Sequence, residues 1–199
     1  MTLPLQNRIE LITPPASDVF TISDLKEHLR VEHDDEDQYI YSLMSAATSF
    51  VDVTGALGKA LINQTWGEWI GPNPRTVLLS LGPVQSVDAI KYYDADNNLQ
   101  TSTLSQFWIL GTAGQTTVTP KTGYKWPTTF NRDDAIKIEY TIGHGTSGSS
   151  IPQAVRHAML MLIGHYYENR ENELIGTISK TLPFGFEDLI NSQRSSWYG

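Results

Sequence analysis

The spacing of apolar residues changes twice along this chain of 199 residues, and the change limits the folds that it can adopt. Within residues 37–51, and again within residues 151–166, apolar side chains recur every three or four positions, as on one face of a helix. From residue 64 to residue 142 the period is two, with aromatic and β-branched runs that are typical of strands. The chain is therefore predicted to be α+β, with a helical core interrupted by an antiparallel, β-rich insertion.

Two N-terminal helices and one long C-terminal helix are predicted from their end signals. Thr21 or Ser23 can cap a short helix over residues 24–29, and acidic residues 34–37 favour the start of a second helix. Pro152 suits the first turn of the last helix. We expect the apolar faces of the second and the last helix to pack on each other.

Six strands are predicted between the helices. The last is the clearest, because its apolar residues alternate with Lys137, Glu139 and Thr141. The connections are too short for parallel crossovers, so they favour antiparallel hairpins. The predicted strands cover residues 65–70, 77–81, 87–93, 107–110, 116–119 and 135–142.

These elements predict one domain over residues 1–199. The helical core would take residues 20–62 and 150–172, and the β insertion would take residues 63–145. Residues 173–199 are left as a C-terminal tail, with apolar side chains and few charges between them. Such a tail is expected to have difficulty in burying its apolar side chains alone.

The composition excludes several classes of protein. The chain has 14 basic and 22 acidic side chains, a formal charge of −8, and no cysteine. Tight nucleic-acid binding, thiolate metal sites and disulfides are therefore not expected. The longest apolar-rich stretch, residues 154–167, is interrupted by charge and too short to span a bilayer, and the N-terminus does not look like a signal peptide. We expect a protein without a membrane partner.

No catalytic residue, cofactor or metal site is predicted. Residues 143–148 read GHGTSG, a literal G-x-G-x-x-G, but they close a run of antiparallel strands, so we interpret them as a loop. The five histidines include no pair at i,i+4 spacing that would bind a metal on a helix. A pair of catalytic carboxylates among the 22 acidic residues is left open.

A series of short motifs between residues 11 and 190 follows the order found in one known family. They are SDLKEHLRV at 23–31, DDED at 34–37, GPVQSV at 82–87, YYD at 92–94, WP at 126–127, IP at 151–152 and YYENRE at 166–171. In this order and spacing the chain resembles the head-tail connector (adaptor) proteins of tailed bacteriophages, in particular the longer members with a β insertion. The particle could belong to a phage, a prophage or a gene transfer agent.

The resemblance implies a non-catalytic neck protein. It implies a ring of about twelve copies beneath the portal, which joins the DNA-filled head to a stopper or another neck or tail protein. It also implies a place in the virion or phage-like particle, assembled in the bacterial cytoplasm. DNA would pass through an acidic lumen without specific binding. The alternatives are a stopper or tail-completion protein of the same neck, and a small α+β hydrolase.

The C-terminal tail is the predicted contact with the portal or a neighbouring subunit. Buried aromatic anchors tend to dominate binding energy at protein interfaces, and this tail carries several aromatic residues. Arginines, among them Arg156 and Arg170, are further candidates for ion pairs with a neighbour. The predicted interface residues of the tail are Phe184, Phe186, Leu189, Ile190, Arg194, Trp197 and Tyr198.

Overall fold

The structure is a computed structural model of the chain, and it describes residues 8–112, 115–170 and 185–194. The chain folds into two compact units. One unit, built mainly from strands, contains Met1–Ala16 and Asn63–Gly143, and we call it the β unit. The other, the helical unit, contains Ser17–Ile62 and His144–Gly199. The predicted α+β class is confirmed.

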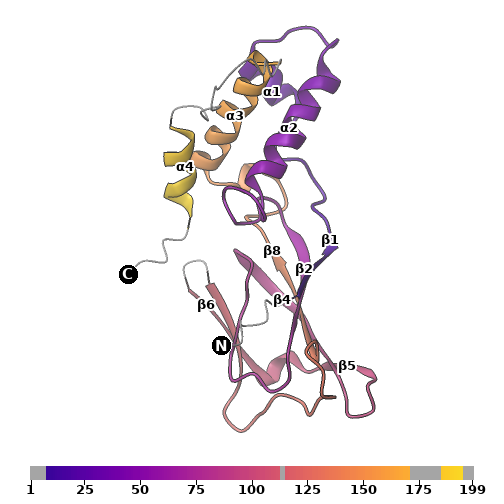
Figure 1. Ribbon diagram of the computed structural model, residues 1–199. Helices are drawn as coiled ribbons and strands as arrows, with labels where there is room; N and C mark the ends of the chain where they lie inside the picture. Colours follow the sequence, from indigo (N-terminus) through magenta and orange to yellow (C-terminus); the bar gives the residue numbers. More distant parts are fainter. Residues whose placement is uncertain (1–7, 113–114, 171–184, 195–199) are drawn as a thin grey trace, which may run out of the picture. The chain divides into compact units, whose positions relative to one another are not determined.

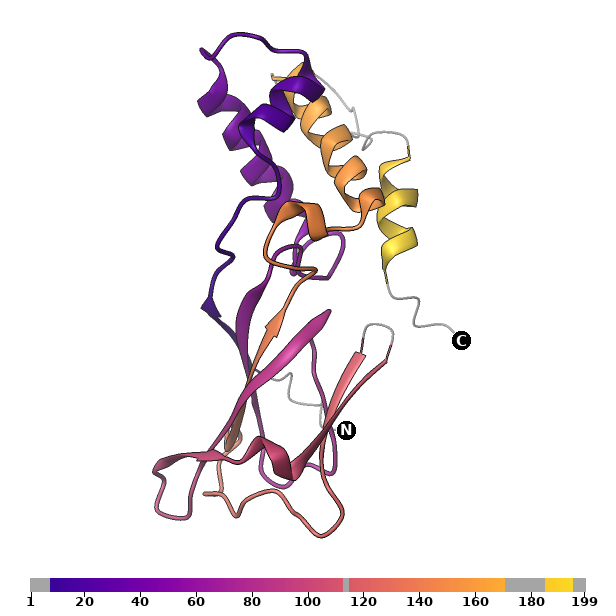
Figure 2. The same ribbon diagram turned by 180° about the vertical axis from the view of Figure 1, so that it is seen from behind.

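The helical unit consists of helices from both ends of the chain. In both views α3 lies between α2 and α4, and α1 packs on α2 and α3 (Figure 1, Figure 2). Thr21, one of the two residues predicted to cap this helix, caps α1 through a capping box with Asp24. The helices are α1 (Ile22–Leu29), α2 (Asp37–Val51), α3 (Gln153–Glu168) and α4 (Phe186–Gln193).

The core of this unit lies between α2 and α3. The buried face of α2 is made by Ile40, Met44, Ala47 and Val51, and it meets the buried face of α3. That face of α3 consists of Val155, Ala158, Met159, Leu162 and Ile163. The predicted packing of these two stripes is confirmed. About 100 residues of chain separate the two helices, and most of them form the β unit.

The β unit contains two antiparallel sheets. One has five strands in the order β1-β2-β8-β4-β5, and the other has three in the order β3-β7-β6. The alternation predicted for the last strand is observed, since Ile136, Ile138, Tyr140 and Ile142 are buried. The strands are β1 (Arg8–Thr13), β2 (Gln64–Ile70), β3 (Val77–Leu78), β4 (Val84–Tyr93), β5 (Leu99–Ser102), β6 (Phe107–Thr112), β7 (Gln115–Pro120) and β8 (Ile136–Ile142).

Three elements differ from the prediction. Strands β1 and β5 were not predicted. Both are edge strands with mostly exposed residues; β5 has no apolar alternation, and β1 alternates over Arg8–Leu11 only, which is a short run. Helix α4 lies in the segment that was predicted as a loosely patterned tail. Among the described residues no helix combines the length and apolar character that a membrane crossing requires.

A buried carboxylate, that of Glu68, links separate segments of the β unit by hydrogen bonds. Glu68 on β2 is fully buried and accepts hydrogen bonds from the Ser80 backbone N–H at 3.0 Å and the Ser80 hydroxyl at 2.7 Å. The Tyr140 hydroxyl on β8 donates to the same carboxylate at 2.8 Å. Burial, followed by the charge of Glu68, raises the pKa of Tyr140. Because a buried carboxylate needs several donors, Glu68 ties the segment after β3 to the β2–β8 pair.

We predict that Tyr140→Phe lowers the free energy of unfolding by about 1–3 kcal/mol, because a buried carboxylate then loses one donor. Urea unfolding should show a lower midpoint with an unchanged slope. The matched control is Tyr124→Phe, since Tyr124 is 52% exposed, and its effect should stay within about 0.5 kcal/mol. Equal effects of the two substitutions would contradict the role given to Glu68.

Candidate assembly surfaces

The structure divides the seven predicted interface residues into groups. Phe186 and Ile190 are buried in the core of the helical unit. Leu189 is half-buried, and Arg194 is exposed, with its Nη1 3.4 Å from the Asn191 side-chain oxygen. The remaining residues, Phe184, Trp197 and Tyr198, lie outside the described residues.

Helix α4 is therefore seated within its own subunit. It packs on α3, and the Phe186 ring lies 6.0 Å from the ring of Phe50 on α2. A buried side chain cannot also contact a partner unless the helix leaves its place. A contact through Phe186 and Ile190 therefore stays a prediction, and it requires α4 to leave its place. The side chains of Leu189 and Arg194 are accessible without such a movement.

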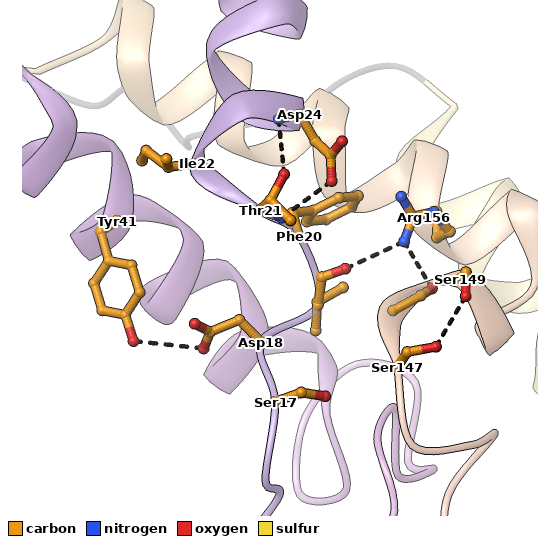
Figure 3. Close-up of a pocket in the computed structure, with 12 residues that line it drawn as sticks. Ser17, Asp18, Phe20, Thr21, Ile22, Asp24, Tyr41, Ser147, Ser149 and Arg156 are labelled. Carbon is orange, nitrogen blue, oxygen red and sulfur yellow. Dashed lines mark hydrogen bonds between the residues drawn. The ribbon is translucent and has the colours of Figure 1, made fainter. Parts of the chain in front are cut away.

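Arg156 on α3 joins two segments that are far apart in the sequence. Its Nη1 donates to the Val19 carbonyl at 3.1 Å and to the Gly148 carbonyl at 2.7 Å, and its guanidinium lies 4.6 Å from the centre of the Phe20 ring (Figure 3). Ser17 adds a hydrogen bond to the Thr146 carbonyl at 2.8 Å. Arg156 thus clamps the segment before α1 to the loop before α3, within one subunit.

An open hollow of about 690 Å³ lies beside this clamp. Its polar groups bond largely among themselves: Tyr41 donates to Asp18 at 3.4 Å, and the Thr21–Asp24 capping box closes the first turn of α1 (Figure 3). No histidine lines it, and Arg156 is already engaged by two carbonyls. The arrangement serves packing at the start of α1 and does not resemble a catalytic centre.

The close approach at this clamp requires glycine at position 148. A Cβ atom there would lie 1.8 Å from the Val19 carbonyl oxygen, which is inside any allowed contact. Gly148 is the last glycine of the sequence that matches a dinucleotide-binding motif. Its role here is to let two backbone segments meet. Residues 143–147 form a loop as predicted, and Gly148 begins a short 3-10 helix (Gly148–Ser150).

We predict that Gly148→Ala destabilises the protein by about 2–3 kcal/mol, because the backbone has to separate to admit one methyl group. A thermal melt followed by circular dichroism measures the change. Gly71→Ala is the control, since its Cβ would meet only the Asp133 carbonyl oxygen at 3.7 Å. If the two variants melt at the same temperature, the clamp contributes nothing to stability.

Arg170 is also engaged within its own chain. Its Nη2 lies 2.7 Å from Glu36, and its guanidinium lies against the rings of Tyr39 and Tyr167. The Tyr167 hydroxyl donates to Glu36, and this bond, followed by that of Arg170, lowers the pKa of the carboxyl group. Arg170 thereby joins the start of α2 to the end of α3. This arginine, a candidate for an ion pair with a neighbour, is thus paired within its own subunit.

One face of the five-stranded sheet carries a chain of opposite charges. Lys137 on β8 pairs with Glu10 on β1 and with Glu139, and Glu139 in turn pairs with Lys91 at 2.8 Å. Burial raises the pKa of Glu139, but the hydrogen bonds from Lys91 and Lys137 leave it below its ordinary value. Gly67 makes room for this chain, because a Cβ there would lie 2.5 Å from Lys137 Cε. These charged side chains thus pair with one another within the subunit.

The three-stranded sheet, in contrast, exposes apolar side chains. Trp108, Ile109 and Leu110 on β6 are between 41% and 53% exposed. Trp108 and Leu110 share one face, and the register places Leu78 on the same face across Thr117. The sequence analysis did not name this strand as a contact surface, although a signal was available, because residues 99–120 contain no Asp, Glu, Lys or Arg.

Among the residues that the structure describes, no group of three or more His, Asp or Glu side chains could hold a metal ion. Burial, followed by the positive charge of Lys59, lowers the pKa of the half-buried His144 ring, which favours its neutral form.

The comparisons with known proteins point to particle assembly. The sequence profile of the head completion protein family matches residues 18–181. Among solved structures, a chain from the neck of an empty gene transfer agent particle, computed with C6 symmetry, has a TM-score of 0.75 at 22% identity, covering 94% of this chain and 95% of that one. No curated protein sequence matches the chain.

Two further chains have the same fold. One comes from the neck of a native gene transfer agent particle computed with C12 symmetry, with a TM-score of 0.68 and 20% identity. The other comes from the virion of a native gene transfer agent particle, with a TM-score of 0.65 and 19% identity. Each match covers 94% of both chains.

The two-unit α+β fold is shared with these particle chains, and the family match covers most of the chain. The chain belongs to the head completion protein family. The resemblance to phage connector proteins is thereby confirmed at the level of the family and its neck fold.

Proposed function

We propose that this protein is a non-catalytic head-tail connector, which forms a ring of twelve copies beneath the portal and joins the DNA-filled head to the next neck or tail protein. The observation that carries the proposal is the fold match to neck chains over 94% of this chain, together with family membership. One of those necks was computed with C12 symmetry, which supports twelve copies. Membership of a head completion family also favours assembly over catalysis.

The charge of the chain suits a channel for DNA. Twelve copies at −8 each carry about −96 formal charges, so a ring of this protein repels the phosphate backbone as a whole. Without neutralised phosphates there is no release of counterions to drive binding, and DNA can slide. The proposed ring lets DNA pass and does not hold it.

The first test measures the mass of the full-length protein by light scattering after size exclusion, alone and mixed with its portal protein. With a chain of 22.2 kDa, we expect a twelve-copy ring of about 266 kDa, or a stable complex that elutes with the portal. A monomer of 22.2 kDa that does not bind the portal would contradict the proposal.

A truncation separates the contact role of the tail from its folding role. Removing residues 195–199 takes away Trp197 and Tyr198 and keeps Phe186 and Ile190, which the helical core needs. The truncated protein should melt like the full chain and bind the portal at least about tenfold more weakly, because aromatic anchors dominate interfaces. Leu189→Ala is the comparison within the described part of the tail. Undiminished portal binding by the truncated protein would remove the last five residues from the interface.

A further inference from the structure

Four strands of the β unit lie at the edge of a sheet, β1 and β5 in the five-stranded sheet and β3 and β6 in the three-stranded sheet. Among the described residues β6 pairs only with β7, and β1 pairs only with β2, so each lies at the end of its sheet. Both strands are six residues long. An unpaired edge presents a row of backbone donors and acceptors that can add a strand from another chain.

Strand β6 has none of the features that normally protect such an edge. Its register with β7 is regular, without a bulge, and it contains no proline and no charged residue. The nearest charge in sequence is Lys121, whose Nζ lies 4.6 Å from the centre of the Trp108 ring. A regular strand with exposed Trp108, Ile109 and Leu110 is the kind of edge that aggregates unless another strand covers it. We therefore expect β6 to be covered in the assembled protein.

Strand β1 offers a matching edge. Its apolar residues Ile9, Leu11 and Ile12 are between 38% and 46% exposed. Its charged residues are paired inside the subunit, Glu10 with Lys137 and Arg8 with Asp134 at 3.9 Å. The register with β2 is regular from Arg8 to Leu11. An incoming strand would thus meet apolar side chains and charges that are already neutralised.

The low charge of both edges favours a second copy of this chain as the occupant. Copies with a net charge of −8 repel each other, and the repulsion is least where neither surface brings unpaired charge. Residues 99–120 bring no charge to such a contact, and the β1 edge is ion-paired. Lys121, which lies over the Trp108 ring, adds a positive charge, and this does not oppose contact between acidic copies. A closed ring requires two different, complementary surfaces on each subunit, and these two edges supply them.

We propose that β6 of one copy pairs with β1 of the next copy, so that the sheets of neighbouring β units continue from subunit to subunit around the ring. The inference rests on the proposed ring and specifies its contact. Backbone hydrogen bonds would hold the strands together, and Trp108 and Leu110 would pack against Ile9 and Leu11 of the neighbouring copy.

The absence of cysteine allows a direct test. Cysteines are placed at Leu11→Cys and Leu110→Cys in the full chain, and the assembled protein, alone or with the portal, is treated with a short bismaleimide. A head-to-tail contact should give a ladder of covalent multimers from the double variant and no dimer from either single variant. Leu99→Cys replaces Leu110→Cys in the control, because Leu99 is 51% exposed on β5, the edge strand at the opposite end of the five-stranded sheet from β1.

The outcomes separate this inference from the proposed function. Dimers from Leu110→Cys alone would mean a two-fold β6–β6 contact, and a control ladder as strong as that of the double variant would mean random collision. Either result overturns the inference. A double variant that has the mass of a ring but does not cross-link also overturns the inference, while the proposed function stands. A chain that never assembles, alone or with the portal, contradicts both.

A charge substitution gives a second readout without cross-linking. Leu110→Lys should raise the concentration for half-assembly at least about tenfold, because a buried unpaired ammonium is costly, while circular dichroism stays that of the folded protein. Leu99→Lys should leave assembly unchanged. Normal assembly of Leu110→Lys would place the subunit contact elsewhere and overturn the inference.

Discussion

The packing of α2 on α3 is the contact on which the rest of the chain depends. The buried faces of these helices come from segments separated by about 100 residues, so everything between them has to leave the helical unit and return to it. The segment inserted between the helices, Asn63–Gly143, meets this constraint by pairing its own first and last strands, β2 and β8. Gln64 at the start of β2 lies opposite Ile142 at the end of β8, so the insertion begins and ends at the same place in one sheet.

The strength of local patterns explains how much of this fold could be predicted from sequence. Strand β8 alternates strictly, and α2 and α3 carry complete apolar stripes, so both structure types and their packing followed from the residues alone. The edge strand β1 alternates over Arg8–Leu11 only, and so short a run does not identify a strand. Helix α4 buries only Phe186 and Ile190 fully, which is too few positions to distinguish a short docked helix from an unstructured tail.

The candidate surfaces were harder to predict for a different reason. Arg156 and Arg170 could be named as interface candidates, but only the fold shows that Val19, Gly148 and Glu36 already engage them. The exposed apolar strand β6 was within reach of sequence reasoning through its charge-free surroundings. In a chain with 36 charged side chains, 22 consecutive residues without any are a sign of a surface that is covered. Exposure of Trp108 itself depends on strand order, which local spacing does not determine.

Whether this protein joins heads to tails is tested on particles produced without it. Cells that make the particle with this chain deleted should yield heads and tails that electron microscopy shows apart, and supplying the wild-type chain should restore joined particles. Joined particles of normal number in the absence of the chain would contradict the account.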